Sequence, residues 1–224
     1  MTELDFLRAT RTSYDAIAAD YTARFVDELA IKPLDRAMLA AFAEYVRAGE
    51  PGQVADLGCG PGRVTAHLRG LGLDAFGLDL SPEMVALARR AYPELRFEVG
   101  SMTELGGLPD GSLAGIVAWY SIIHLPPAQL PTVLAEFHRI LAPGGQLLLA
   151  FQVGDEPVHR EEGFGRSIDL TFHRRRPEQV VELLAESGLA IRARLVREAA
   201  EDGMEKVPQA FLLATKSTKS TKSG

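Results

Sequence analysis

The sequence predicts an α/β domain with a mostly parallel sheet that is covered by helices on both faces. Short apolar runs alternate with helical patterns through the middle of the chain, as consecutive β-α-β units require. A cluster of three glycines directly follows the first apolar run, at residues 58–62. Ligands bind beyond the carboxyl ends of such strands, so this position favours a binding loop. With 224 residues, the chain is long enough for one domain with a full core.

Strands are predicted where apolar and β-branched runs are bounded by turn residues. The predicted strands are Gln53–Leu57, Asp74–Leu78, Arg96–Val99, Gly115–Tyr120, Gln146–Val153, Leu189–Arg197 and Gln209–Thr215. The last two are joined by a short polar connection, which is more typical of a hairpin loop than of a helical crossover. We therefore expect these two strands to run antiparallel to each other.

Helical patterns occupy the intervals between the first five strands. The predicted helices are Gly62–Leu71, Ser81–Ala91, a short piece near Met102–Leu105, and Pro127–Leu141. In the second of these, Ser81 is the expected N-cap and Pro82 the first helical residue. The stretch LAPGG, residues 141–145, predicts a helix end followed by a turn. Two more helices, about Phe6–Asp20 and Pro33–Ala48, precede the first strand and are in a position to cover the ligand-binding edge.

Composition and charge favour a globular protein without a basic binding surface. Hydrophobic residues make up 46% and charged residues 24%, as in ordinary globular chains. A net charge of -6 argues against a non-specific nucleic-acid or membrane surface, which is usually basic. With one cysteine and no expected signal peptide or transmembrane segment, we expect a cytoplasmic protein. We expect residues 1–215 to form the domain, with 1–50 as an N-terminal helical cap and 216–224 as a disordered tail.

The glycine loop, residues 58–62, departs from two familiar nucleotide-binding patterns. A P-loop would require Lys followed by Ser or Thr, and a dinucleotide fingerprint would require a third glycine where Arg63 stands. Asp56, two residues before the loop, would repel a pyrophosphate and instead suits a cationic group such as an amino group or a sulfonium. The alternative is a plain strand-to-helix turn that happens to be rich in glycine.

A second carboxylate, Asp79, ends the second predicted strand, 21 residues after Gly58. An acid at this position can accept hydrogen bonds from both hydroxyls of a ribose. The alternative is an acidic residue that the dipole of the following helix favours.

Taken together, these motifs resemble the class I S-adenosylmethionine-dependent methyltransferases. The stretches that carry the resemblance are VADLGCGPGRV, GLDLSPEMVALARR, FEVGSMTELG, GIVAWYSIIHLP and ILAPGGQLLLAF. They stand in the order and spacing of the family's motifs, and the resemblance covers roughly residues 10–215. It implies a Rossmann-like seven-stranded sheet of order 3-2-1-4-5-7-6 in which strand 7 is antiparallel, in agreement with the terminal hairpin predicted above.

The resemblance also implies S-adenosylmethionine as the cofactor and assigns residues to its parts. The methionine part should be lined by Asp56, Gly58, Cys59 and Gly60. The ribose should be held by Asp79, and the adenine should be contacted by Leu80, Met84, Ser101 and Met102. Tyr120 and Ser121 should lie beside the methionine and the reactive methyl group. The two methionines have core filling as their alternative role. Cys59 is expected to pack within the loop rather than act as a nucleophile, because no His or Asp partner stands at a recognisable spacing.

Candidates for the region of the transferred methyl group are aromatic or titratable. Tyr14 and Tyr21 are seven residues apart and so share a helical face. In similar enzymes this segment covers the cofactor, although an amphipathic helix with aromatic core residues would show the same pattern. His124 follows the fourth strand and is a candidate base or substrate-orienting group, with capping of the next helix as its alternative role. The candidate catalytic residues are thus His124, Tyr14 and Tyr120.

A cationic run in this acidic chain marks a candidate acceptor site. His173 is followed by Arg174, Arg175 and Arg176. One or two of the arginines are expected to clamp a carboxylate or a phosphate-like group, and the alternative is a solvated run of charge. The segment at about 154–176 falls where similar enzymes carry a substrate lid.

These observations predict a methyltransferase that acts on an oxygen or nitrogen of a small molecule, with an anionic acceptor as a hypothesis. A hydroxyl or ammonium acceptor would need a base, whereas a carboxylate would not. One alternative is an NAD(P)-dependent oxidoreductase, which the absence of a third glycine and the presence of Asp56 disfavour. The other is a non-catalytic S-adenosylmethionine-binding protein. We expect no metal site, since the sequence has no Cys/His cluster, and no nucleic-acid or membrane partner.

Overall fold

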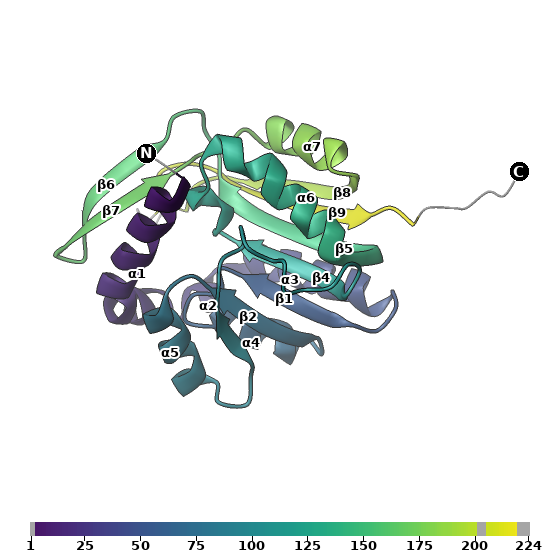
Figure 1. Cartoon of the computed structure of the whole chain (residues 1–224), viewed down its shortest axis with the longest axis horizontal. Helices are drawn as coiled ribbons and strands as arrows, with labels where there is room; N and C mark the ends of the chain where they lie inside the picture. Colours follow the sequence, from purple (N-terminus) through teal and green to yellow (C-terminus); the bar gives the residue numbers. More distant parts are fainter. Residues whose placement is uncertain (1–2, 201–204, 219–224) are drawn as a thin grey trace, which may run out of the picture.

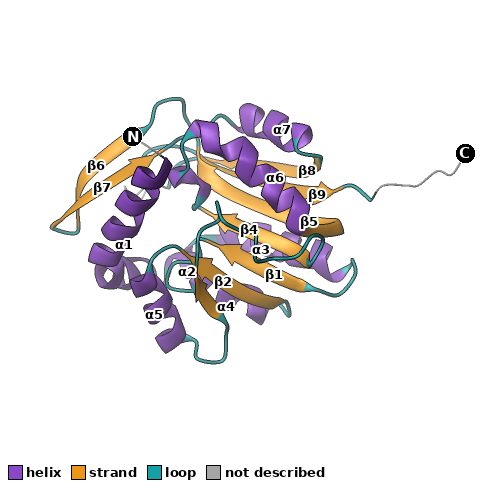
Figure 2. Cartoon of the chain, viewed as in Figure 1, coloured by secondary structure: helices purple, strands orange, loops and turns teal. Residues whose placement is uncertain are grey.

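The computed structural model describes residues 3–200 and 205–218. A seven-stranded sheet crosses the molecule in the order β3-β2-β1-β4-β5-β9-β8, with helices on both faces (Figures 1 and 2). Its strands are β1 (Gln53–Leu57), β2 (Asp74–Asp79), β3 (Phe97–Val99), β4 (Leu113–Trp119), β5 (Leu141–Gln152), β8 (Leu189–Arg197) and β9 (Gln209–Lys216). Strands β1 to β5 are parallel, whereas β9 is antiparallel to both β5 and β8. The expected α/β class, strand order and antiparallel last strand are confirmed.

The helices bury apolar stripes against the two faces of the sheet. They are α1 (Glu3–Phe25), α2 (Glu28–Ile31), α3 (Pro33–Arg47), α4 (Arg63–Gly70), α5 (Pro82–Ala91), α6 (Leu130–Ile140) and α7 (Pro177–Glu186). Side chains of α3 and α4 join one buried cluster and those of α6 and α7 join another. Phe42 on α3 and Phe137 on α6 are fully buried on opposite faces, and each burial contributes about 1.5–3 kcal/mol. All residues of β4 are buried between these layers, as a central parallel strand requires.

Several predicted boundaries differ from those observed. Strand β5 begins at Leu141 rather than at Gln146, because the LAPGG stretch stays in the sheet and Leu141 pairs with Leu113 of β4. The helix predicted near Met102–Leu105 is replaced by a turn, which the amide of Glu104 closes by donating to the carbonyl of Ser101. Ser81 does cap α5 as expected, since its hydroxyl accepts from the amide of Met84 at 3.1 Å.

A β-hairpin between β5 and α7 was missed by the sequence prediction. Strands β6 (Val158–Gly163) and β7 (Arg166–Phe172) pair in antiparallel fashion and lie against α1 (Figure 1). Phe164 and Gly165 form their turn with positive φ angles of 54° and 70°, the conformation that two-residue hairpins favour. Ile168 and Leu170 pack on Ile17 of α1. The sequence does not predict this hairpin, because its exposed residues are charged and few of its residues are apolar.

The C-terminal end extends the sheet further than expected. Lys216 belongs to β9, and its ammonium donates to the carbonyl of Leu141 at 2.8 Å. The predicted disordered tail therefore does not begin at 216, and residues 219–224 lie outside the described residues. Within the described part of the chain, no helix has the length and apolar character needed to span a membrane.

Candidate functional site

The glycine loop is held at the carboxyl end of β1 by backbone contacts. The amides of Gly58 and Cys59 both donate to the carbonyl of Leu78 at the end of β2, at 2.7 and 3.1 Å. Gly58 has a φ of +78°, and a Cβ atom there would lie 2.3 Å from Cβ of Ser121. Because L-residues rarely adopt this conformation and no room exists for a side chain, glycine is required at this position.

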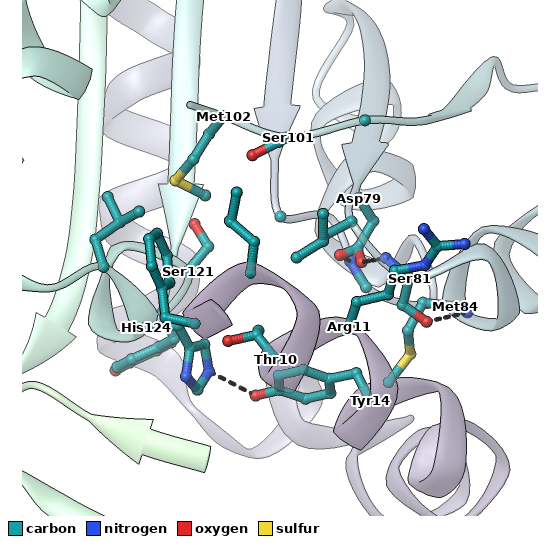
Figure 3. Close-up of a pocket in the computed structure, with 18 of the residues that line it drawn as sticks. Thr10, Arg11, Tyr14, Asp79, Ser81, Met84, Ser101, Met102, Ser121 and His124 are labelled. Atoms are coloured by element: carbon teal, nitrogen blue, oxygen red, sulfur yellow. Dashed lines mark hydrogen bonds between the residues drawn. The ribbon is translucent and has the colours of Figure 1, made fainter. Parts of the chain in front are cut away.

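A cavity opens between this loop, β2, the end of β4 and α1, and we call it the edge cavity (Figure 3). Its predicted site residues are Tyr14, Tyr21, Gly58, Gly60, Asp79, Leu80, Met84, Ser101, Met102, Tyr120, Ser121 and His124. The sequence prediction did not include Phe6, Thr10 and Arg11 of α1, which also line it. No local pattern marks these three residues, since their place depends on how α1 crosses the sheet edge.

Asp79, the last residue of β2, lines the edge cavity. Its carboxylate accepts hydrogen bonds from the amides of Gly60 at 2.7 Å and Ser81 at 2.8 Å. Burial raises the pKa of Asp79 to about 6, although both amide donors favour the charged form. Asp15 of α1 accepts from the hydroxyl of Ser81 at 2.5 Å and so ties the covering helix to this wall.

The side chains of Asp56 and Cys59 do not line the edge cavity. Asp56 is fully buried, and its Oδ2 accepts from the Thr65 hydroxyl at 2.7 Å. Burial raises the pKa of Asp56 to about 7, in part against that hydrogen bond. The Cys59 side chain packs on Val85 and Phe97, and burial also raises the pKa of its thiol well above the usual value. Such a thiol is a packing group.

Tyr14 and His124 meet across the edge cavity (Figure 3). The Tyr14 hydroxyl lies 2.8 Å from Nε2 of His124, while Nδ1 of the same ring lies 3.2 Å from the carbonyl of Thr171. A carbonyl can only accept, so Nδ1 carries the proton and Nε2 accepts from the tyrosine. Burial lowers the pKa of His124 to about 4, which keeps the imidazole neutral. Tyr14 also makes an edge contact with Tyr21, with ring centroids 5.7 Å apart.

Tyr120 follows β4 in a backbone conformation that is unusual for its residue type. Its φ is +53°, a region in which a bulky residue is strained. Its buried hydroxyl has no hydrogen-bond partner among the described residues, and burial raises its pKa above the usual value. The neighbouring Ser121 donates to the carbonyl of Leu57 at 2.6 Å, which locks β4 to β1 at this point.

A second, larger cavity adjoins the first through Tyr14, Tyr21 and Tyr120, and we call it the basic cavity. Its volume is about 400 Å³, within the range of small-molecule sites. Its charged lining residues are Arg24, Lys32, Arg63, Arg160, Arg174, Lys206, Glu28 and Glu205. Six basic groups against two acidic ones give this lining a positive character in a chain whose net charge is -6.

The cationic run at 173–176 is divided among different surroundings. Arg174 lines the basic cavity, and its Nε has no partner within the described residues. Arg175 points elsewhere: its guanidinium is buried and donates to the carbonyls of Ile122 and Leu125 at 3.0 and 2.6 Å. Arg176 forms an exposed ion pair with Asp155. Of these three arginines, one or two of which are expected to bind an anion, Arg174 lines the basic cavity, whereas Arg175 and Arg176 do not.

His173 is likewise separated from Arg174. It lines a third cavity, which His124 also borders. Its amide donates to the carbonyl of Ile123 at 2.7 Å. Neighbouring residues of an extended chain point in alternate directions, so these side chains could not all reach one anion.

A chain of ion pairs with alternating charges runs from α4 to the segment that joins β8 and β9, and we call these residues the ion network. From one end to the other, its members are Arg63, Glu28, Lys32, Glu205, Arg197 and Asp35. Burial alone would raise the pKa of Glu205, but hydrogen bonds from Arg197 and Lys32 lower it to about 2. The sequence prediction missed this network, because the Lys32–Glu205 pair joins residues 173 positions apart.

The comparisons with known proteins agree that this chain is similar to methyltransferases. The profile of a family described as a methyltransferase domain matches residues 54–145. The demethylmenaquinone methyltransferase of Chlorobaculum parvum is 30% identical over 60% of this chain and 56% of its own length. The trans-aconitate 2-methyltransferase of Methylobacterium nodulans is 39% identical over 49% of this chain and 42% of its own length. The chain thus spans about half the length of these curated relatives.

Among solved structures, a similar one is the Burkholderia thailandensis 1,6-didemethyltoxoflavin-N1-methyltransferase with bound 1,6-didemethyltoxoflavin and S-adenosylhomocysteine. It superimposes with a TM-score of 0.72 at 22% identity and covers 97% of this chain and 91% of that one. At this identity the likeness establishes the fold.

Proposed function

The chain belongs to the class I S-adenosylmethionine-dependent methyltransferases, and from this premise we propose that it transfers a methyl group from S-adenosylmethionine to an oxygen or nitrogen of a small-molecule acceptor. The observation that carries the proposal is the edge cavity, which brings together the glycine loop, Asp79 and the residues that follow β4. We also propose a cytoplasmic location and a single domain that includes strand β9 to its end at Lys216.

The residues of the edge cavity fit this cofactor. Gly58 and Gly60 leave the loop without side chains where a ligand must approach. The carboxylate of Asp79 can accept from ribose hydroxyls, and Met84 and Met102 provide apolar contact for an adenine. The side chain of Ser101 completes the adenine end, and its hydroxyl is held by Thr103 at 2.8 Å.

In the proposed mechanism the protein mainly supplies alignment and a dry site. When bound, the cofactor provides a sulfonium-activated methyl group for an in-line displacement. Tyr14, Tyr21 and Tyr120 lie between the two cavities and are proposed to exclude water from the space between donor and acceptor. The free hydroxyl of Tyr120 is proposed to orient the acceptor atom.

We propose an anionic acceptor in the basic cavity, with Arg174 as its binding residue. The unpartnered Nε of Arg174 and the excess of basic lining residues both support this proposal. His124 supports it too, because an imidazole with a pKa of about 4 is a weak base at neutral pH. A carboxylate acceptor releases no proton, and trans-aconitate, the compound in the name of one relative, is a carboxylate.

The hairpin of β6 and β7 is proposed to act as the lid of the acceptor site. Arg160 and Phe164 from the hairpin line the basic cavity, and so does Phe172 at its end. Ser13 of α1 accepts from the amide of Asp169 at 2.8 Å, which ties the hairpin to the helix that lines both cavities.

The cofactor proposal is tested by calorimetric titration of the whole chain with S-adenosylmethionine and with NADH. We expect binding of S-adenosylmethionine alone, weakened at least about tenfold by Asp79→Ala because hydrogen bonds to a charged group are lost. Binding of NADH would favour the oxidoreductase alternative and contradict the proposal. Catalysis is then tested by S-adenosylhomocysteine release with a panel of carboxylates and their methyl esters.

The acceptor proposal is tested with neighbouring arginines. Arg174→Gln is expected to raise KM for a carboxylate acceptor about tenfold, while Arg176→Gln, which alters an exposed ion pair outside both cavities, serves as the matched control. Equal KM values for both variants would remove Arg174 from the acceptor site.

A further inference from the structure

The turn of the β6–β7 hairpin holds an aromatic residue in a conformation that does not suit it. Phe164 and Gly165 join the two strands, and their φ angles are 54° and 70°. Asn or Gly is usual at the first position of such a turn, because a bulky side chain is strained there. Local strain of this kind persists mainly where it serves a function, so the Phe164 side chain calls for an explanation.

The Phe164 side chain is part of the wall of the basic cavity. It is 45% exposed, and it lines this cavity together with Phe172 and Val158 of the same hairpin. Phe172 and Val158 pair with each other across the two strands. A single exposed apolar residue is ordinary on a protein surface, but here three apolar residues of one hairpin line the same cavity. The hairpin thus provides an apolar wall, which Arg160 interrupts.

Aromatic residues of α1 provide a second apolar wall. Tyr14, Tyr21 and Phe25 line the basic cavity, and the distances between successive ring centroids are 5.7 and 4.6 Å. Aromatic rings present large apolar areas and have few rotatable bonds, so they bind apolar groups at a small entropic cost. A ligand of this cavity therefore gains affinity from an apolar body.

The cations of the basic cavity leave one half-buried group free to bind an anion. Lys32 and Arg63 are both paired with Glu28, whereas Arg174 is half-buried and its Nε has no partner among the described residues. The other basic residues of the lining are exposed, and they are Arg24, Arg160 and Lys206. Exposed cations stay hydrated and attract anions without holding them tightly. One anionic group is thus matched by Arg174, whereas further anionic groups would lie against apolar walls, where unpaired charge is costly.

We propose that the acceptor is a carboxylate with an apolar body, and that Phe164 is a specificity-determining residue that contacts this body. The inference rests on the proposed function and names the class of its acceptor. Arg174 binds the carboxylate, and the walls from the hairpin and α1 cover the rest of the molecule. Asn or Gly at position 164 would suit the turn but would remove part of this apolar surface, which accounts for the strained aromatic residue.

The inference is tested by calorimetry on the whole chain saturated with S-adenosylhomocysteine, using carboxylates with different bodies. We expect 3-phenylpropanoate and hexanoate to bind at least about tenfold more tightly than acetate and trans-aconitate, because only the first two carry an apolar body that covers the walls. The comparison of 3-phenylpropanoate with hexanoate distinguishes an aromatic body from an alkyl one.

Phe164→Asn should weaken binding of the two apolar carboxylates about fivefold or more and that of acetate less than about twofold. Since Asn suits this turn, the midpoint of thermal unfolding should change by less than about 2 °C, and Phe164→Gly should give the same result. Arg174→Gln should instead weaken binding of all four carboxylates alike. Arg166→Gln is the matched control and should change no affinity, because Arg166 follows the same turn, does not line the basic cavity and forms an exposed pair with Asp20.

Two results would overturn the inference and leave the proposed function in place. One is tighter binding of acetate or trans-aconitate than of the apolar carboxylates, and the other is an equal loss for acetate and 3-phenylpropanoate in both variants of Phe164. Binding of S-adenosylhomocysteine without binding of any carboxylate would overturn the anionic acceptor together with this inference. Failure of the unaltered chain to bind S-adenosylhomocysteine at all would overturn the proposed function itself.

Discussion

The two halves of the sheet's carboxyl edge are built in different ways. Beside β1 and β2, backbone amides of the glycine loop form the site, as when the amide of Gly58 donates to the carbonyl of Leu78 and that of Gly60 to the carboxylate of Asp79. Beside β5 and β9, side chains from distant segments form it, as when Lys32 of the N-terminal region pairs with Glu205 near β9. The first half depends on conformation and the second on charge pairs that exist only in the complete fold.

This difference suggests how each half fails. In the β1–β2 half, an added methyl group should do more damage than a lost charge, because φ angles and close approaches determine the loop. In the β5–β9 half, the loss of one buried charged group should do most damage, since it leaves its former partners without hydrogen bonds. The following variants test this contrast in order of expected effect.

The largest effect is expected from Gly58→Ala. The new Cβ would lie 2.3 Å from Cβ of Ser121 and would demand a φ of +78°. Strain of about 1–3 kcal/mol adds to the clash, so affinity for S-adenosylhomocysteine should fall about 100-fold or more by calorimetry. Gly70→Ala is the control, because a Cβ there meets nothing within 4 Å. Comparable affinity in both variants would show that the loop tolerates side chains.

The next largest effect is expected from Arg175→Met, in the other half. The guanidinium is buried and donates to the carbonyls of Ile122 and Leu125, which lose their donor while the aliphatic packing is kept. Urea unfolding should show a loss of about 2–4 kcal/mol in the free energy of unfolding. Arg194→Met removes an exposed ion pair with Glu178 and should cost less than about 1 kcal/mol. Similar losses in both would contradict a structural role for Arg175.

A pH-dependent effect is expected from Asp56→Asn. Its pKa is raised by burial from 3.8 to about 7, so the folded state holds a proton that the unfolded chain releases between these values. The cost of the buried carboxylate is thus fully present above pH 7 and disappears as the pH falls toward 3.8. Relative to the unaltered chain, Asp56→Asn should gain roughly 2 kcal/mol in free energy of unfolding between pH 5 and pH 7.

Urea titrations at pH 5, 6, 7 and 8 measure this gain, and Thr65→Val sharpens the result. The Thr65 hydroxyl favours the charged form of Asp56, so its removal should extend the pH-dependent loss of stability to higher pH. A difference between Asp56→Asn and the unaltered chain that stays constant with pH would show that Asp56 is charged throughout this range.

The contrast also explains how far the sequence could predict the structure. The Ser81 cap joins residues three positions apart, the glycine loop and Asp79 each stand at the end of a predicted strand, and strand β1 was predicted with its observed bounds. The hairpin of β6 and β7 could not be predicted, because its stability comes from packing on α1, for example Ile168 on Ile17. Tertiary contacts there outweigh a weak local pattern.

The site shows the same division. Most residues implied for the cofactor are identifiable in the sequence because they stand at or just after the end of a strand, whereas Met84 lies within α5 and Tyr14 and Tyr21 lie within α1. Arg63 departs from the dinucleotide fingerprint, but its burial beside Trp119 depends on how α4 packs against the sheet. The long-range pairs of the ion network, such as Lys32 with Glu205, could not be predicted, since charged residues at such separations carry no information about their partners.

The smallest effect on stability is expected at Arg176, although the neighbouring residue Arg175 is expected to have a large one. Arg176 and Asp155 form a pair at 2.9 Å whose side chains are 56% and 68% exposed. A double-mutant cycle with Arg176→Gln and Asp155→Asn should give a coupling energy below about 0.5 kcal/mol, because water and salt screen the pair. A coupling above 1 kcal/mol would mean that the pair is shielded from solvent. The contributions of Arg175 and Arg176 to stability would then differ less than their different exposure indicates. The contrast between buried and exposed charged groups would weaken accordingly.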